Sequence, residues 1–575
     1  MYKRFILAAV LSFAIVAISI GDEVIKKKKP QEQKYKDIAS QVKLFGEVYR
    51  EVGRRYVDEL DVKDFMRAGI DGMLGDLDPY TVFFDPAEQE SIQMLTKGEY
   101  GGVGIEIGLR GDDKELTVVA PMSDSPAARK GLRSGDVIIA VDGKSTAGFT
   151  TADAAKHIKG PSGTEVTLTI RRASAKAPLD YTLVRENIQI HDIAYSGMLD
   201  EEIAYVKLTR FSKNAGNDLE QILKDLIKNE DPKGLILDLR SNPGGLLPAA
   251  VKVSEQFLQK KEIIVSTKGR IKQANREFRT RRDPVAGDIP LIVLINRGSA
   301  SASEIVSGAI QDLDRGVILG TQSFGKGLVQ TVINLNNGNA VKITTARYYT
   351  PSGRLIQKIK YDQDSDEPEM LTGLEKIPEP GEVDTTAERF STRAGREVYG
   401  GGGITPDLTI KPKLMNPMSV ELYRQDLFFN FIDNWLAVEG RPDTVIVTDD
   451  MMTAFNDFLD EKEFEYPIKG MDELNTLRQL GEKDSLNEDY FKLIDNLEAE
   501  LSVENEDLEP EVQDFIYQNL DRQLASALGG REWRIRSTFD EDTVLTVAID
   551  ILRDQERYHS MLQPHTSTDA DDVTD

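Results

Sequence analysis

The sequence predicts a multidomain protein built around an α/β core. Two short, almost wholly apolar runs carry this prediction, Gly234–Leu239 and Leu291–Ile295, because each is followed by a turn of small or polar residues and then by a helical pattern. A third apolar run, Gly316–Gly320, adds another buried strand. With 575 residues the chain exceeds one ordinary domain, and about two to four domains are expected.

Residues 1–21 have the layout of an export signal. A short basic start precedes the apolar run Phe5–Ile20, and acidic residues follow it. Small residues at Ser19 and Gly21 fit cleavage, whereas the length of the run also fits a retained membrane anchor. We therefore expect an exported, extracytoplasmic protein of the periplasm or cell envelope, associated with the inner membrane if this segment is retained.

Residues 22–95 are predicted to be a polar linker followed by a helical region. Val42, Phe45 and Val48 recur at helical spacing, and a proline-enforced turn at Leu77–Tyr80 closes the region. The region contains no motif with chemistry. We expect it to serve as a scaffold or as the contact of a homodimer.

The composition excludes several classes of function. There are 97 acidic against 71 basic residues and a net charge of −26, which argues against nucleic-acid binding. Cysteine is absent, so disulfides, cysteine nucleophiles and thiolate zinc sites are excluded. The four histidines are scattered along the sequence, which argues against a clustered metal site. We expect neither a metal nor another cofactor.

A glycine-rich loop and an apolar run characterise residues 96–187. The loop Gly101–Gly104 leads into a predicted strand. Gly131–Gly143 contains a second strand, and Thr151–Lys159 is a predicted helix. Together these segments resemble a PDZ domain. The resemblance implies that a protein tail with apolar last residues adds as a strand, while N–H groups of the loop take its carboxylate. The predicted peptide-binding residues are Gly101, Gly102, Val103, Gly104, Ile105, Ile107, Ala155 and Ile158.

Three serines lie among small residues in the segment that joins Leu291–Ile295 to the next predicted helix. A corner between a strand and a helix can hold a nucleophile against free backbone N–H groups and the positive end of a helix dipole. Ser301 with Glu304 also matches a helix capping box, a pattern that by itself carries no chemistry.

Lys326 stands between two glycines, and Gln330 follows four residues later. If Gly327–Leu335 is extended, as its alternation of apolar residues indicates, the two side chains lie on the same face. A lysine in such surroundings can lose hydration and act as a neutral base. A serine with such a lysine is a known pairing of nucleophile and base.

The serine and lysine motifs together resemble the C-terminal processing (tail-specific) peptidases, a family of Ser/Lys proteases. The matching segments are Gly298–Glu304 and Phe324–Gly327, in the order that the family has them. The resemblance implies a ClpP/crotonase-like α/β serine protease core over residues 188–412. The implied catalytic residues are Ser301 as nucleophile, Lys326 as base and Gln330 as the residue that supports the base.

The loop Arg240–Gly245 follows the first buried strand. Its glycines free N–H groups that could face an oxyanion, although an ordinary turn before a helix needs the same residues. The family resemblance implies one oxyanion donor from this loop, either Gly244 or Gly245, and another from Ala302. The choice between the two glycines stays open.

Three further segments contain no motif with chemistry. Tyr361–Ala394 is acidic and contains proline, which predicts a mobile surface insertion. Residues 413–564 are mostly helical by period, for example over Leu422–Ala437 and Asp542–Leu562, and are expected to pack on the core or to help a dimer form. Residues 565–575 are predicted to be a disordered acidic tail.

Two other enzyme motifs are matched only in part. Gly320–Lys326 resembles a phosphate-binding loop, but the next residue is Gly327, where magnesium binding needs serine or threonine. The G-x-S-x-G motif of esterases lacks its glycines around Ser301. The sequence therefore predicts an exported serine endopeptidase that acts on proteins with apolar C-terminal tails. The alternative is a non-catalytic PDZ scaffold that binds protein C-termini.

Overall fold

The computed structural model describes residues 34–358 except 112 and 173, and residues 388–411, 415–466, 470–503 and 510–564. The chain divides into a larger unit, Ala87–Val329 with Thr345–Asp575, and a smaller unit, Met1–Pro86 with Gln330–Thr344. The predicted export signal, the acidic tail and most of the predicted surface insertion lie outside the described residues. Among the described helices, none combines the length and the apolar character needed to cross a membrane.

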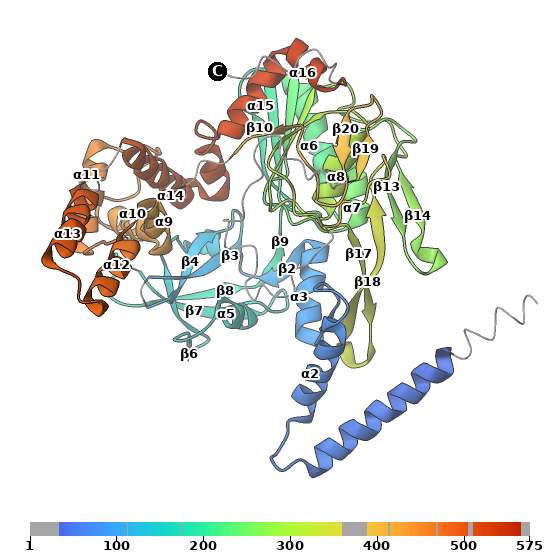
Figure 1. Ribbon diagram of the computed structural model, residues 1–575, viewed down its shortest axis with the longest axis horizontal. Coiled ribbons are helices and arrows are strands. Elements are labelled where there is room, and N and C mark those ends of the chain that lie inside the picture. The colour runs from blue at the N-terminus through green and yellow to red at the C-terminus, as the bar shows by residue number, and fades with distance from the viewer. Residues whose placement is uncertain are drawn as a thin grey trace, which may run out of the picture. The chain divides into compact units, whose positions relative to one another are not determined.

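A six-stranded sheet forms the core of the larger unit (Figure 1). In spatial order its strands are β10 (Ile193–Met198), β11 (Ile203–Leu208), β12 (Gly234–Asp238), β15 (Leu291–Ile295), β16 (Val317–Gly320) and β21 (Leu408–Thr409). Neighbouring strands are parallel, except that the edge strand β10 is antiparallel to β11. The three apolar runs predicted as strands form β12, β15 and β16, each to within one residue. Helices cover both faces of such a sheet, which is why these runs have no polar side.

Alternate residues of the central strands pack against two different helical layers. The layers consist of α6 (Ala215–Glu230), α7 (Leu247–Ser254) and α8 (Ala302–Asp312) on one face, and of α15 (Thr543–Arg553) and α16 (Gln555–Met561) on the other. Leu235 and Leu237 contact the first layer, whereas Ile236 contacts the second. α8 is buried along its whole length. The C-terminal end of the chain therefore supplies one complete covering layer of the core.

The chain also forms a five-stranded antiparallel sheet. Its strands are β1 (Val82–Phe84), β13 (Ile263–Lys268), β14 (Arg276–Arg279), β17 (Leu328–Asn334) and β18 (Ala340–Tyr349). β13 pairs with β14 on one side and with β18 on the other. The strands β17 and β18 continue into the smaller unit. A separate ribbon consists of β19 (Arg389–Ser391) and β20 (Glu397–Tyr399).

A small β domain follows helix α3 (Pro86–Lys97) in the chain. It contains β3 (Ile105–Arg110), β4 (Glu115–Pro121), β5 (Val137–Val141), β6 (Lys144–Ser145), β7 (Glu165–Arg171), β8 (Leu179–Val184), α4 (Pro126–Lys130) and α5 (Thr151–Ile158). The chain enters and leaves it through a ribbon of β2 (Glu99–Gly102) and β9 (Glu186–Gln189). The strand order β3-β4-β5-β7-β8 leaves β3 at an edge of the sheet. The helix predicted at Thr151–Lys159 is confirmed as α5.

A helical domain precedes α15. It consists of α9 (Pro417–Arg424), α10 (Leu427–Val438), α11 (Asp449–Glu461), α12 (Met471–Lys483), α13 (Glu488–Val503) and α14 (Pro510–Arg536). Aromatic side chains fill its core, where the rings of Phe428 and Phe455 stack at 5.2 Å between centroids. The mostly helical character predicted for this part of the chain is confirmed.

Two helices predicted as continuous are in fact broken. The prediction for Leu422–Ala437 is wrong at Asp426, which adopts φ +54° between α9 and α10. The prediction for Asp542–Leu562 is wrong at Asp554, whose side chain accepts the Arg557 N–H at 3.0 Å and so starts α16. At Asp554 the carboxylate satisfies an N–H group that a new helix leaves open, whereas Asp426 breaks the helix through its left-handed backbone and makes no side-chain cap.

The described part of the smaller unit includes two helices, residues 34–55 and α2 (Val62–Gly75). The turn predicted at Leu77–Tyr80 follows α2, and Val82–Phe84 then forms strand β1, antiparallel to β18. Aromatic and β-branched residues favour this extended conformation. Asp78 fixes the turn before the strand by accepting two backbone N–H groups, both at 2.9 Å.

The helical domain contacts the small β domain through charged side chains. Arg110, the last residue of the edge strand β3, pairs with Asp426 at 2.5 Å. Asp433 lies so close to Gly135 that a Cβ atom on this glycine would collide with the Asp433 carboxylate. Burial raises the pKa of Asp433 to about 6, and the negative charge of Asp136 adds to the shift.

Replacing Asp433 by asparagine is expected to stabilise the protein at pH 8 and to have little effect at pH 4. The folded-state pKa of about 6 lies above the ordinary value of 3.8. Between pH 3.8 and pH 6 the folded protein therefore binds more protons than the unfolded chain. Its stability therefore falls as the pH rises through this window. At higher pH the buried charge costs about 3 kcal/mol, which asparagine avoids. Thermal unfolding at the two pH values measures the difference.

The variant Asp443→Asn is the matched control, because it changes an exposed carboxylate of the same domain. We expect it to shift the melting temperature little at either pH. Equal stabilisation by Asp433→Asn at pH 4 and at pH 8 would contradict the raised pKa.

Candidate active site

Ser301 occupies the corner between β15 and α8. Its backbone has φ +55° and ψ −107°, a region that residues other than glycine rarely adopt. As the N-cap residue of α8, it lies at the positive end of the helix dipole. Ser301 is half-buried, whereas the residues of α8 that follow it are buried. Backbone strain of this kind persists only where surrounding contacts hold the residue in place.

The carboxylate of Glu304 binds the backbone of both Ser301 and Lys326. Its Oε2 accepts the Ser301 N–H at 2.7 Å and the Lys326 N–H at 3.0 Å. Its Oε1 accepts the Ser323 hydroxyl at 2.6 Å and the Gly325 N–H at 2.7 Å. Burial raises the pKa of this carboxyl, and the hydrogen-bond donors oppose the shift. The capping-box interpretation thus describes one of the four hydrogen bonds that Glu304 accepts.

Tyr348 makes a second connection between the serine and lysine segments. Its side chain is buried and belongs to β18. The hydroxyl lies within hydrogen-bond distance of the Lys326 carbonyl and, at 3.1 Å, of the Ser301 carbonyl. From the sequence, Tyr348 belongs to a segment that resembles the family, but no role could be assigned to it. The structure therefore brings the main chains of Ser301 and Lys326 side by side.

Lys326 lies in the loop between β16 and β17 and is half-buried. The Gly327 N–H donates to Gln357 Oε1 at 2.9 Å, which fixes the backbone after the lysine as Glu304 fixes the backbone before it. Gln330 belongs to β17 and to the smaller unit. Its Nε2 atom is buried, and no hydrogen-bond partner is found for it among the described residues.

Asn242 joins the glycine loop to the serine corner. Its side chain is fully buried, donates to the Leu208 carbonyl at 2.8 Å and accepts the Gly244 N–H at 2.9 Å. Its own carbonyl accepts the Ala300 N–H at 3.0 Å and the Ser303 hydroxyl at 2.8 Å. Sequence reasoning treated this asparagine only as part of a turn. It holds the loop after β12 against the segment that carries Ser301.

The two glycines of this loop differ in what their backbone groups do. A Cβ atom on Gly244, which has φ +96°, would lie 2.9 Å from Ser301 Cβ and 2.8 Å from the Ala302 nitrogen. The Gly244 N–H is already engaged, and its carbonyl accepts the Phe211 N–H at 3.1 Å. A trans peptide directs its C=O and N–H in opposite directions. The Gly245 N–H therefore points away from Phe211.

A cavity of about 330 Å³ lies between the edge strand β3 and helix α5. Its lining includes six of the eight residues predicted to bind peptide. Gly101 and Gly102 belong instead to β2, where Gly101 packs against Gly160. The predicted residues in the lining are Val103, Gly104, Ile105, Ile107, Ala155 and Ile158, and the residues that sequence reasoning missed are Met94, Tyr100, Thr151, Lys159 and Ile190.

Two N–H groups of the glycine-rich loop turn away from the rest of the small β domain. The Val103 carbonyl accepts the Ala127 N–H at 3.0 Å, and the Gly104 carbonyl accepts the Met122 N–H at 2.9 Å. By the same geometry of the trans peptide, the N–H groups of Gly104 and Ile105 point away from these partners. Because β3 is an edge strand, an extended peptide can pair with its open side.

The fold and the site define a serine protease that carries a PDZ domain. Residues 202–366 match peptidase family S41, residues 117–172 match a PDZ domain, and residues 418–552 match the C-terminal helical domain of a probable PDZ-protease. Among the described residues, no three histidine, aspartate or glutamate side chains converge so that they could hold a metal ion.

Comparison with individual proteins narrows the family further. The carboxy-terminal-processing protease of Bartonella bacilliformis is 42% identical over 332 residues, which cover 57% of this chain and 74% of that protein. The carboxyl-terminal-processing protease of Synechocystis sp. is 35% identical over 320 residues, which cover 55% and 74%. Among solved structures, the photosystem II D1 C-terminal processing protease has 28% identity, covers 65% of this chain and 94% of its own, and gives a TM-score of 0.35. This chain belongs to peptidase family S41, the C-terminal processing proteases.

Replacing Glu304 by glutamine is expected to lower kcat by about 10- to 100-fold. The amide keeps the size of the carboxylate but offers one acceptor oxygen instead of two, so the donors on one side lose their partner. Steady-state cleavage of an unfolded protein measures kcat, and thermal unfolding reports any loss of structure.

The control is Glu421→Gln, which changes a buried glutamate of the helical domain that pairs with Arg424. This variant is expected to keep the wild-type kcat. A folded Glu304→Gln protein with wild-type kcat would show that the four hydrogen bonds do not matter for catalysis.

Proposed function

We propose that this protein is an exported serine endopeptidase that recognises protein C-terminal tails through its PDZ domain and cleaves with Ser301 and Lys326. One observation carries the proposal. The buried Glu304 carboxylate binds the backbone N–H groups of both residues, so the nucleophile and the base belong to adjacent stretches of main chain. Membership of family S41 supports the same assignment.

In the proposed mechanism, the neutral Lys326 amine takes the proton from the Ser301 hydroxyl as its oxygen attacks the peptide carbonyl. The protonated lysine then gives this proton to the leaving amine, and an acyl-enzyme remains. Water attacks the acyl-enzyme with Lys326 again as the base. This mechanism requires the Lys326 amine to be neutral before it accepts the proton.

The oxyanion of the tetrahedral intermediate is assigned to the N–H groups of Gly245 and Ala302. The Gly244 N–H already donates to Asn242, which favours Gly245 as the donor from the loop. Ala302 begins α8, where backbone N–H groups lack helical partners and the helix dipole is positive. Loss of one such donor typically costs about 3–4 kcal/mol of transition-state stabilisation.

Gln330 is proposed to orient the Lys326 amine by a hydrogen bond. The family resemblance implies this role, and a buried side-chain nitrogen without a partner among the described residues is consistent with a group that acts during catalysis.

Tail recognition is assigned to the cavity between β3 and α5. A substrate tail would pair with the open side of β3, with its carboxylate on the Gly104 and Ile105 N–H groups. The lining is mostly apolar, which favours tails that end in apolar residues. Lys159, whose ammonium lies 4.9 Å from the centre of the Tyr100 ring, adds a positive charge to the same cavity.

We also propose export through the N-terminal segment, with membrane association where that segment is retained. Homodimer formation is proposed through the helix of residues 34–55. Apolar side chains on this helix are exposed to an unusual degree, with 51% exposure for Ile38, 66% for Val42 and 50% for Phe45. Burying such a stripe against a second copy would remove apolar surface from water.

Ser301→Ala and Lys326→Met are each expected to lower proteolysis by at least about 1,000-fold, because one removes the nucleophile and the other removes the base. Cleavage of an unfolded protein with an apolar C-terminal tail measures this. Lys233→Met, at an exposed lysine of the larger unit, is the control and is expected to keep full activity. Proteolysis that survives in either catalytic variant would favour the non-catalytic scaffold with a contaminating activity.

Ala155→Asp is expected to weaken the binding of an apolar tail peptide by at least about 10-fold, because it buries a charge in an apolar groove. KM for a tail-bearing substrate should rise accordingly. Fluorescence anisotropy of a labelled tail peptide measures the affinity. Lys156→Asp changes the neighbouring exposed residue of α5 and should leave the affinity unchanged. Equal effects of the two variants would rule out the groove as the binding site.

A further inference from the structure

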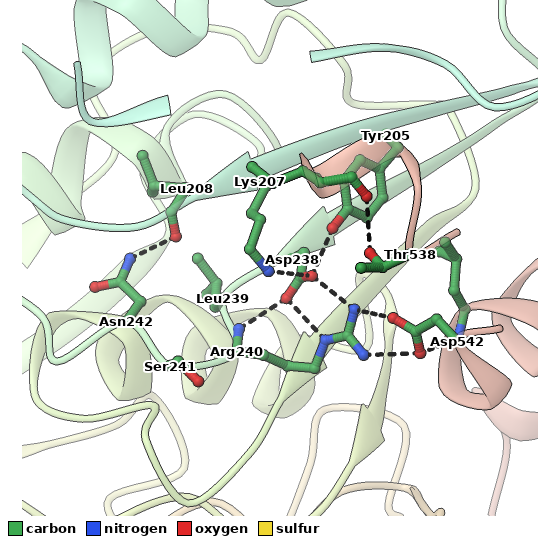
Figure 2. A network of polar contacts seen from close by, with 12 residues as sticks. Tyr205, Lys207, Leu208, Asp238, Leu239, Arg240, Ser241, Asn242, Thr538 and Asp542 are labelled. Carbon is green, nitrogen blue, oxygen red and sulfur yellow. Dashed lines mark hydrogen bonds and ion pairs between the residues drawn. The ribbon is translucent and has the colours of Figure 1, made fainter. Parts of the chain in front are cut away.

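Asp542, the N-cap residue of α15, binds an arginine at the start of the glycine loop. Its Oδ1 accepts Arg240 Nη1 at 2.9 Å and its Oδ2 accepts Arg240 Nη2 at 2.6 Å, a bidentate pair (Figure 2). The two residues are 302 positions apart in the sequence. The match to the peptidase family ends at residue 366, so Asp542 comes from a part of the chain outside that match.

Arg240 is bound equally closely to Asp238 at the end of β12. The Arg240 N–H and Nε donate to Asp238 Oδ1 at 2.8 and 3.0 Å, and Nη2 donates to Oδ2 at 2.7 Å. Asp238 is fully buried and also accepts Lys207 Nζ at 2.9 Å and the Tyr205 hydroxyl at 2.6 Å. Burial opposes its ionisation, but the charges of Arg240 and Lys207 hold the pKa of Asp238 below its usual range.

Asp542 balances the charges of this network. With it, two cations face two carboxylates, and the side chains of Arg240 and Asp542 are only 17% and 18% exposed. Without its carboxylate, one positive charge would lie in excess at a place with little water. The planar guanidinium also needs both carboxylates to hold its orientation, because each binds a different edge of it.

The network lies at the base of the proposed oxyanion loop. Arg240 is followed directly by Ser241, which adopts φ +58°, and by Asn242. Figure 2 shows these residues as one stretch that leads from the charged network to the contact of Asn242 with the Leu208 carbonyl. Asn242 also accepts a hydrogen bond from the Gly244 N–H. A change in the position of Arg240 therefore acts on the loop within a few residues of its glycines.

We propose that Asp542 is a positioning residue for the oxyanion loop. Its carboxylate fixes the Arg240 guanidinium, and through it the backbone that presents the Gly245 N–H to the reacting carbonyl. The segment that begins α15 is thereby part of the catalytic apparatus as well as a cover for the sheet. This inference rests on the proposed function, in which the loop supplies an oxyanion donor.

The chain contains a matched control for this contact. Arg553, at the other end of α15, pairs with Asp200 at 2.7 Å, and Asp200 precedes β11. This ion pair also joins α15 to the core, but neither residue adjoins the glycine loop in sequence. Disrupting it with Arg553→Gln tests whether any loosened contact of α15 is enough to change catalysis.

The test compares Asp542→Asn, Arg240→Lys and Arg553→Gln in the full chain. Titration with a covalent serine reagent gives the fraction of active enzyme, so that kcat is expressed per active site. KM for a tail-bearing protein and the inhibition constant of a peptide aldehyde are measured in parallel. The aldehyde forms a tetrahedral adduct on serine, and its oxygen takes the place of the oxyanion.

For Asp542→Asn we expect kcat to fall by about 10- to 100-fold, with KM within about twofold of wild type and weaker inhibition by the aldehyde. Arg240→Lys keeps the charge but loses the bidentate fork, and should show the same pattern. Arg553→Gln should leave all three quantities unchanged.

Wild-type kcat in Asp542→Asn and Arg240→Lys would overturn the proposal, and so would an equal fall in kcat for Arg553→Gln. If Asp542→Asn does not fold, Arg240→Lys alone decides between these outcomes. Failure of the proposed function is distinguishable, because it would appear as activity that survives Ser301→Ala.

Discussion

One buried carboxylate holds the parts of the proposed catalytic site together. Glu304 lies in the first turn of α8, where glutamate is common. Its two oxygens nevertheless accept hydrogen bonds from the serine corner and from the lysine loop. Burying a charge there is unfavourable, and four donors offset part of that cost. The strained backbone of Ser301 and the close approach of Gly244 both lie at this corner.

The rest of the chain is arranged so that distant segments converge on the two loops beside this corner. Asn242 joins the glycine loop to it from β12, and Tyr348 joins the lysine loop to it from β18. α15 covers the opposite face of the same sheet and reaches the base of the glycine loop through Asp542. The helical domain that precedes α15 also holds Arg110, at the end of the strand proposed to receive the substrate tail. The C-terminal part of the chain thus contacts both the proposed binding domain and the proposed catalytic loop.

Much of this arrangement could be predicted from short-range patterns. β12, β15 and β16 were predictable because a strand covered on both faces is a continuous apolar run. The corner at Ser301 was predictable because its small residues stand between such a run and a helix. The contacts that fix the site were not predictable. A glutamate three residues after a serine has the same pattern whether or not it binds a second loop, and nothing local links Arg240 to Asp542. The breaks at Asp426 and Asp554 were missed because helical periodicity continues across them.

We propose that Glu304 brings Ser301 and Lys326 into a working pair of nucleophile and base. A crystal structure of the enzyme with a bound peptide aldehyde is the decisive measurement. We expect an adduct on Ser301 Oγ, with the adduct oxygen within hydrogen-bond distance of the Gly245 and Ala302 N–H groups and Lys326 Nζ within reach of Oγ. An adduct on another residue, or a Lys326 amine directed away from Oγ in that complex, would contradict it.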